Sequence, residues 1–169
     1  MNNNTQSPAA ACKHRVFWDD VFTECKSMWK VAMKYDDASW HYGGDFPEGA
    51  PEELGGTHIG LFLRYFFTRG WVGDIHTEEY PDAVAAVIDG TMSGTDFLFK
   101  YCDEKLTDED FNTEGNAIAE QYYGESGLYL SDYAVHFADL MYAAPESKHD
   151  FNKYAKMIEE RLASGKLTS

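Results

Sequence analysis

The sequence predicts an all-α fold, a single compact domain of about six or seven helices around a central apolar helix at about residues 52–69. Most of its longer segments place apolar residues three and four positions apart, which is the spacing of amphipathic helices. Hydrophobic residues make up 44% of the chain and aromatic residues 15%, enough to bury a sizeable core. No internal repeat occurs, and low complexity is confined to the N-terminus, so one domain is expected.

The chain is expected to divide into a disordered tail at residues 1–13 and a single helical domain at residues 14–169. The tail has no basic start and no apolar run of the kind that a secretion signal needs. Apolar residues at positions 18, 21, 22, 25, 28, 29, 32 and 33 then predict an amphipathic helix over residues 16–33.

The central helix is predicted from the segment 51–70, after an ordered loop at 35–47 that contains two adjacent glycines. Pro51 and two carboxylates open the segment and Arg-Gly closes it, as helix ends favour. Apolar side chains surround almost the whole helix between positions 59 and 67, which indicates burial on every side. Gly60 costs about 1 kcal/mol relative to Ala inside a helix. We therefore expect another backbone to pack closely against Gly60.

Five further helices are predicted downstream, at residues 77–89, 96–102, 107–124, 128–141 and 147–163. Gly90 is expected to end the first of them, and Thr107 to supply the N-cap hydroxyl of the third. The Leu-Tyr-Leu sequence at 128–130 is compatible with a strand, but the length of its segment favours a helix.

The charge excludes several classes of partner. The chain has 29 acidic and 14 basic side chains, a net charge of −15, and residues 35–147 hold 23 acidic but only four basic groups. Nucleic acid and anionic membranes would repel such a surface. The simple interpretation is a solvated surface that keeps the protein soluble, and the more specific one is an acidic face for a basic protein partner.

The compartment is expected to be the cytoplasm. The longest apolar stretch, residues 59–67, is far shorter than a membrane span. The three cysteines are odd in number and unpatterned in spacing, which fits a reducing compartment without disulfides.

One polar cluster has the residue types of a metal site or a catalytic site. Carboxylates and imidazoles that ligate divalent metals are close in sequence at Asp36, Asp37, His41, Asp45 and His58. Their spacing matches no standard ligand motif, and such side chains commonly cap backbone groups in loops. The structural interpretation is therefore the default, and no metal, cofactor or catalytic residue is expected.

The sequence lacks residues that define the common calcium-binding, nucleophilic and phosphate-binding motifs. Asp108, Asp110 and Asn112 alternate as in a calcium-binding EF loop, but Thr113 stands where that loop needs Gly and Ala119 where it needs Glu. Gly-x-Ser-x-Gly elbows, Cys-His motifs and phosphate-binding glycine loops do not occur. The sequence thus contains no recognisable enzymatic motif.

Three strings resemble a known family. They are YDDASWHYGGDFP at 35–47, THIGLFL at 57–63 and DEKLTDEDFNTEGN at 103–116. With Tyr122-Tyr123 and the LSDY string at 130–133, they resemble small, stand-alone bacterial cytoplasmic proteins for which no enzymatic activity is known. Members of that family are similar to polymorphic-toxin immunity proteins in size, acidity and architecture.

Together these observations favour an immunity protein, without enzymatic activity, that binds and neutralises a bacterial toxin with a basic surface. Two alternatives stay open: a homo-oligomeric scaffold or regulatory module, for example a homodimer, and a metal-dependent hydrolase that uses the Asp/His cluster. The expected partner-binding surface is acidic and contains an aromatic residue. Its candidate residues are Asp36, Asp37, Trp40, His41, Asp45, Glu52, Glu53, Glu78, Glu79, Asp108, Glu109 and Asp110.

Overall fold

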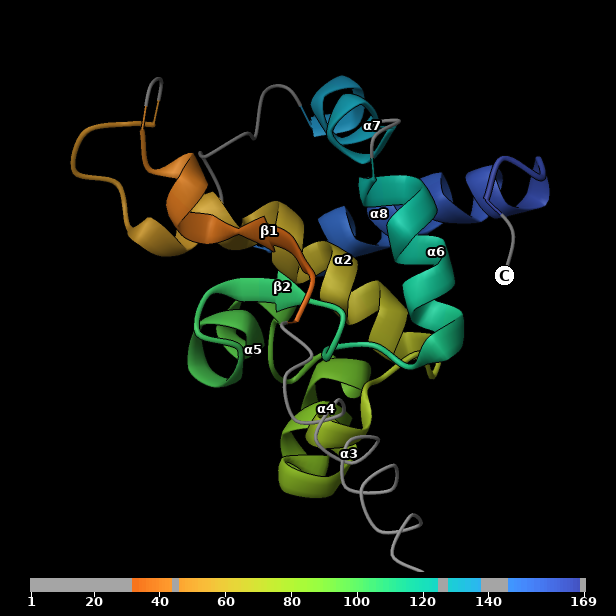
Figure 1. Cartoon of the computed structure of the whole chain (residues 1–169). Helices are drawn as coiled ribbons and strands as arrows, with labels where there is room; N and C mark the ends of the chain where they lie inside the picture. The colour runs from red at the N-terminus through yellow and green to blue at the C-terminus, as the bar shows by residue number, and fades with distance from the viewer. Residues whose placement is uncertain (1–31, 44–45, 125–127, 138–145, 168–169) are drawn as a thin grey trace, which may run out of the picture. The chain divides into compact units, whose positions relative to one another are not determined.

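The computed structural model describes residues 32–43, 46–124, 128–137 and 146–167 (Figure 1). The chain divides into two units, Met1–Val31 and Ala32–Ser169, and every described residue belongs to the second. The tail expected at 1–13 and most of the helix expected at 16–33 therefore lie outside the described residues. At the end of that predicted helix, residues 32 and 33 are not helical and lead directly into a strand.

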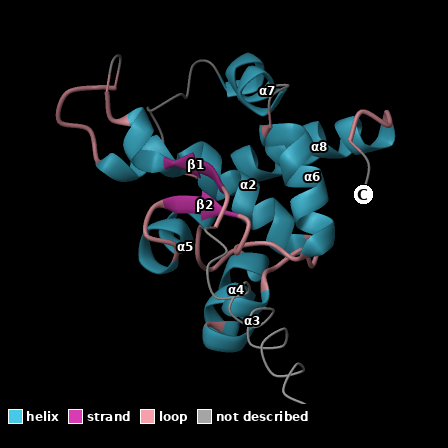
Figure 2. Ribbon diagram, in the orientation of Figure 1, coloured by secondary structure: helices cyan, strands magenta, loops and turns pink. Residues whose placement is uncertain are grey.

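The described residues are mainly α-helical, as the sequence predicted (Figure 2). The helices are α2 (Thr57–Thr68), α3 (Asp74–Glu79), α4 (Pro81–Asp89), α5 (Gly94–Tyr101), α6 (Thr113–Tyr123), α7 (Leu128–Phe137) and α8 (Lys148–Ala163). Two 3-10 helices, η1 (Ala38–His41) and η2 (Glu52–Gly56), precede α2. A two-stranded antiparallel sheet joins β1 (Lys34–Asp37) to β2 (Lys105–Thr107).

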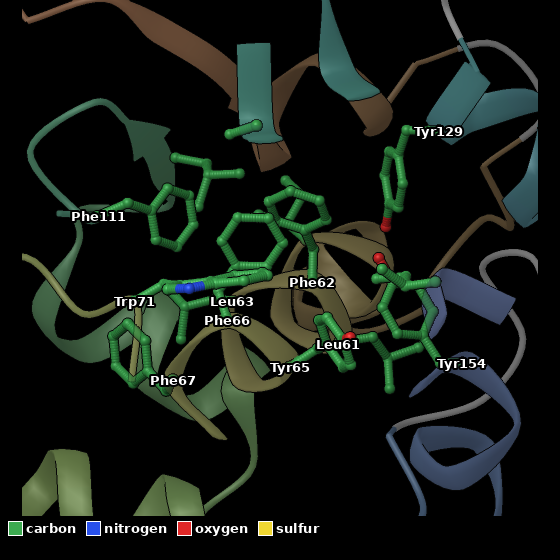
Figure 3. Close-up of a cluster of buried hydrophobic side chains, with 14 of the residues drawn as sticks. Leu61, Phe62, Leu63, Tyr65, Phe66, Phe67, Trp71, Phe111, Tyr129 and Tyr154 are labelled. Carbon is green, nitrogen blue, oxygen red and sulfur yellow. The ribbon is translucent and has the colours of Figure 1, made fainter. Parts of the chain in front are cut away.

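Helix α2 is the centre of the core, as predicted, but it begins at Thr57 because the first five residues of the predicted helix form η2. All residues of α2 from Thr57 to Phe67 are buried. Aromatic side chains surround it: Figure 3 shows Trp71 and Phe111 on one side and Tyr129 and Tyr154 on the other. Although α2 is apolar, neither it nor any other helix in the described ranges has the length and hydropathy to span a bilayer.

Helices α2 and α5 pack closely because each has a glycine at their contact. A Cβ atom on Gly60 would lie 2.3 Å from the backbone nitrogen of Thr95, and one on Gly94 would lie 1.9 Å from the carbonyl oxygen of Gly60. Both distances are far below van der Waals contact, so no larger residue fits there without movement of a backbone. This confirms the sequence-based expectation for Gly60.

The sheet was not predicted. Residues 35–47 were expected to form a loop, but their start belongs to β1, where Asp36 pairs with Leu106 of β2. The predicted helix at 107–124 is wrong in its first six residues, because Thr107 pairs with Lys34 in the sheet. The α-helix in this segment is α6, which begins at residue 113. The side chain of Asn112 caps it by accepting a hydrogen bond from the Gly115 amide at 2.9 Å.

Pro81 divides the helix predicted at 77–89. Residues 74–79 form α3, and Pro81 starts α4 at a first-turn position where its missing N–H is not needed. Gly90 ends α4 in the left-handed region with φ of 81°, as the sequence indicated. The helices predicted at 96–102, 128–141 and 147–163 correspond to α5, α7 and α8, with residues 138–145 outside the described ranges.

Candidate functional site

The fold brings three members of the predicted Asp/His cluster together. Asp36 lies in β1, His41 ends η1, and His58 is the second residue of α2. The strand pairing with β2 directs the buried Asp36 side chain toward the start of α2, and η1 returns His41 to the same carboxylate. We term Asp36, His41 and His58 the Asp36 cluster.

The carboxylate of Asp36 bridges the two imidazoles. Its Oδ1 lies 3.0 Å from Nε2 of His41, and its Oδ2 lies 3.2 Å from Nε2 of His58. The two imidazole rings meet edge to face with centroids 4.3 Å apart. The backbone N–H of Asp37 also donates to Oδ1 of Asp36 at 2.8 Å. The cluster therefore ties β1, η1 and α2 together through one carboxylate.

The electrostatics keep the Asp36 carboxyl ionised and the His58 imidazole neutral. Burial alone would raise the pKa of Asp36, but hydrogen bonds from His41 and His58 outweigh it and lower the pKa below its usual range. Burial lowers the pKa of His58, and Asp36 only partly opposes that effect. Since an ionised carboxylate can only accept, both Nε2 atoms carry a hydrogen and donate to Asp36.

Asp37 has a structural role beside this cluster. Its Oδ1 caps η1 by accepting from the Ser39 backbone N–H at 3.0 Å and from the Ser39 hydroxyl at 2.5 Å. Its Oδ2 accepts from Lys34 Nζ at 2.7 Å. This is the capping role that the sequence indicated for acidic residues in the segment. Asp45, the remaining member of the predicted set, lies outside the described residues.

A second cluster, not predicted from the sequence, consists of the buried His76 and Asp110 and the half-buried Cys102. Nε2 of His76 lies 2.7 Å from Oδ1 of Asp110 and 3.9 Å from Sγ of Cys102. The other oxygen of Asp110 accepts from the backbone N–H of Thr107 at 2.6 Å and from its hydroxyl at 3.1 Å. Burial raises the pKa of the Cys102 thiol, so the thiol stays protonated and unreactive at neutral pH.

This second cluster does not have the arrangement of a nucleophilic triad. In a Cys-His-Asp triad the carboxylate and the thiol use opposite ring nitrogens, whereas here both lie against Nε2 of His76. Nδ1 of His76 is buried and has no hydrogen-bond partner among the described residues. The sequence does not show that His76, Cys102 and Asp110 meet, because they come from three separate segments. It does contain one local signal, since the spacing between Thr107 and Asp110 is typical of a turn capped by a side chain.

The predicted partner-binding surface must be corrected at three positions. Asp36, Asp37 and Asp110 are 4%, 5% and 4% exposed, because their carboxylates accept hydrogen bonds inside the fold. His41 and Asp108 are half-buried. The exposed members of the predicted surface are Trp40, Glu52, Glu53, Glu78, Glu79 and Glu109.

Five of these six exposed residues, all except Glu109, form two separate groups. Glu52 and Glu53 precede the N-terminus of α2, whereas α3, with Glu78 and Glu79, follows its C-terminus. The twelve residues of α2 span about 18 Å. Figure 1 accordingly shows β1 in the upper part of the view and α3 at the bottom. We term Trp40, Glu52 and Glu53 the Trp40 surface.

The Trp40 surface adjoins a depression. Helices η1 and η2 pack against each other, and Trp40 on η1 is 62% exposed. An open depression of about 500 Å³ begins at Glu53. It is lined by Glu53, Thr91, Met92, Asp96, Phe99 and Lys100. Met92 and Phe99 supply apolar surface, and the two carboxylates outnumber the single ammonium of Lys100, so the lining can contact the methylene groups of a long basic side chain and attract its charge.

One protein family has a sequence model that matches this chain. The model of a domain of unknown function, DUF7832, matches residues 34–146, which is more than half of the sequence. The chain belongs to this family. The DUF7832 region contains both clusters and the Trp40 surface, and ends just before α8. No curated protein and no solved structure matches the chain.

Proposed function

We propose that the chain is an immunity protein that binds a basic bacterial toxin through the Trp40 surface and thereby blocks the toxin's active site. The observation that carries the proposal is the exposed indole of Trp40 on η1, which packs against η2 with its two exposed glutamates. Tryptophan is strongly enriched among residues that dominate binding energy in protein interfaces. A side chain of that size, 62% exposed, buries a large apolar area when a partner covers it.

The charge distribution supports a basic partner. Among the described residues between 35 and 147, thirteen carboxylates are exposed, but only two basic side chains, Arg69 and Lys100, are. Toxins that act on nucleic acids need basic clefts to hold phosphates. A complementary acidic protein gains association rate and specificity from the attraction between opposite charges.

A lysine of the same chain contacts the Trp40 indole. Lys34 Nζ lies 5.2 Å from the centroid of the Trp40 ring, but the same ammonium pairs with Asp37 at 2.7 Å. Glu52 and Glu53 form no ion pair within the described ranges. A lysine or arginine of the toxin would therefore find both an aromatic face and unpaired carboxylates.

The proposal is tested by co-expressing the chain with the product of the adjacent gene and measuring their affinity at two salt concentrations. We expect a stoichiometric complex. Trp40→Ala should weaken it about 30-fold, the equivalent of a 2 kcal/mol hot spot. The double variant Glu52→Lys/Glu53→Lys should slow association and reduce its salt dependence.

The matched control is Glu78→Lys/Glu79→Lys, which makes the same charge change at the other end of α2. This control should change the association rate and its salt dependence much less than the substitutions at Glu52 and Glu53 do. Equal effects of the two double variants would show that net charge alone attracts the partner. That result, or failure to obtain any complex, would overturn the proposed surface.

A further inference from the structure

The geometry points to a binding site for a divalent transition-metal ion of the Zn²⁺ class at the Asp36 cluster. This inference is independent of the proposed function, because none of the three ligands belongs to the Trp40 surface. The donor set is two imidazole nitrogens and one carboxylate oxygen. Zinc sites and the 2-His-1-carboxylate sites of iron enzymes use this combination.

The distances between the ligand atoms are already close to those in a tetrahedral zinc site. The Asp36 oxygens lie 3.0 and 3.2 Å from the two Nε2 atoms, and one ligand atom from each residue can be chosen so that all lie within 4.8 Å of one another. In a tetrahedral site with bonds of 2.0–2.1 Å, neighbouring ligand atoms are roughly 3.3 Å apart. A metal ion therefore fits between these atoms with only small side-chain movements: it takes the place of the hydrogens on the two Nε2 atoms, and each neutral imidazole then carries its hydrogen on Nδ1.

One side of the cluster is accessible. The side chain of His41 is 17% exposed, whereas those of Asp36 and His58 are 5% and 4% exposed. The ion enters beside His41, where water supplies the remaining ligand. Asp36 is also oriented from outside the site, since the Asp37 amide donates to its Oδ1. Such outer hydrogen bonds hold a ligand in place and strengthen metal sites.

The identity of the donors selects the class of ion. Imidazole favours zinc, copper, iron and nickel, whereas magnesium and calcium favour sites made only of oxygen. Two of the three donors here are imidazoles, so Zn²⁺ should bind and Mg²⁺ and Ca²⁺ should not compete at similar concentrations.

Among the described residues, a second group of metal-ligating side chains, His76, Cys102 and Asp110, is distinguishable from the first. Its donors include the Cys102 thiol, and two of its members, His76 and Asp110, are 3% and 4% exposed. Both oxygens of Asp110 already accept hydrogen bonds within the fold. A metal held there would have a thiolate ligand, which gives Co²⁺ an intense sulfur-to-metal charge-transfer absorption.

The test uses the full chain, stripped with a chelator and then titrated with Zn²⁺ by calorimetry and with Co²⁺ by absorption spectroscopy. We expect one equivalent of Zn²⁺ and visible Co²⁺ bands without charge transfer from sulfur. His41→Ala should weaken Zn²⁺ binding at least ten-fold, since loss of a ligand costs no less than loss of a supporting hydrogen bond. Asp36→Asn should do the same while preserving the shape of the side chain.

His149→Ala is the matched control, because it removes an exposed imidazole from α8. It should leave the affinity unchanged, and circular dichroism should show that each variant is folded. The inference is overturned if no stoichiometric binding occurs. It is also overturned if His41→Ala and Asp36→Asn bind like the wild type, or if the Co²⁺ spectrum shows a thiolate ligand that Cys102→Ser removes.

Discussion

Asp36 and His58 are 22 positions apart in the sequence, yet Oδ2 of Asp36 lies 3.2 Å from Nε2 of His58 in the buried interior. The contact joins β1 to the first turn of the central helix. Tyr129 of α7 reinforces this position by donating its hydroxyl proton to the carbonyl oxygen of His58 at 2.5 Å. Residues from three segments therefore fix where α2 begins.

His58→Ala should destabilise the protein by about 1–3 kcal/mol, because it leaves Oδ2 of a buried carboxylate without its hydrogen-bond donor. Urea denaturation in the presence of a chelator measures this effect free of any metal contribution. The exposed control His149→Ala should change the unfolding free energy by less than about 0.5 kcal/mol. Equal stabilities of the two variants would show that the Asp36 contact contributes nothing.

Gly60→Ala should also destabilise the protein, although alanine favours a helix by about 1 kcal/mol over glycine. The added Cβ would lie 2.3 Å from the nitrogen of Thr95, so α2 and α5 must separate. Overpacking of this kind typically costs about 1–3 kcal/mol. Thermal denaturation measures the result, with Gly43→Ala as the control, since a Cβ there meets no atom within 4 Å. A Gly60→Ala variant as stable as the wild type would contradict the close packing.

The sequence predicted those parts of the fold that depend on local pattern. Helix α2 was found because its apolar run lies within one segment, and Gly60 indicated a close helix contact for the same reason. Its start was placed too early, because Pro51 and the two carboxylates open η2 instead. The β1–β2 sheet was missed because its strands have four and three residues and lie far apart in the chain. Pairing of such short, distant strands depends on the rest of the fold.

The candidate site was predicted only in part, because the burial of its charged residues also depends on distant parts of the chain. The local density of Asp and His residues drew attention to Asp36, His41 and His58, which do meet. The same acidity suggested a surface position for Asp110, which is buried because His76 and Thr107 satisfy its carboxylate. Sequence shows that a residue is charged, but burial of a charge depends on partners that only the folded chain brings near.

The stability should fall at acidic pH partly because of Asp132 in α7. Burial alone would raise the pKa of this carboxyl, but hydrogen bonds from Arg161 and Tyr122 outweigh it and lower the pKa. A carboxyl with a lowered pKa in the folded state stabilises the fold above its unfolded pKa of about 3.9 and loses that contribution as the pH falls below it.

Asp132→Asn tests this contribution. At pH 7 the variant should be about 1.5–3 kcal/mol less stable than the wild type, as expected for loss of hydrogen bonds to a charged group. Urea denaturation at pH 7 and again at about pH 3 should show the difference shrinking, because below about pH 3.9 the unfolded wild type binds a proton at this carboxyl and is thereby favoured. A difference that stays constant between the two pH values would exclude ionised Asp132 as its source.

Breaking the buried ion pair between Arg64 and Glu146 should destabilise the protein more than breaking an ion pair on the surface. Arg64 Nη1 donates to Oε1 of Glu146 at 2.6 Å, and Oε2 accepts from the Gly94 amide at the start of α5 at 2.8 Å. The Glu146 side chain is 1% exposed and that of Arg64 10%. Removing one partner of a buried pair leaves an uncompensated charge, which typically costs about 3–5 kcal/mol.

Urea denaturation should therefore show that Glu146→Ala lowers the unfolding free energy by about 3–5 kcal/mol. Glu146→Gln should be less harmful, because its amide oxygen can still accept from the Gly94 N–H. Glu160→Ala is the control: its exposed carboxylate lies 3.9 Å from Lys156 one turn earlier in α8. Exposed helical pairs of this kind contribute about 0.3–0.5 kcal/mol. If Glu146→Ala cost no more than Glu160→Ala, the buried pair would not stabilise the junction of α2 and α5.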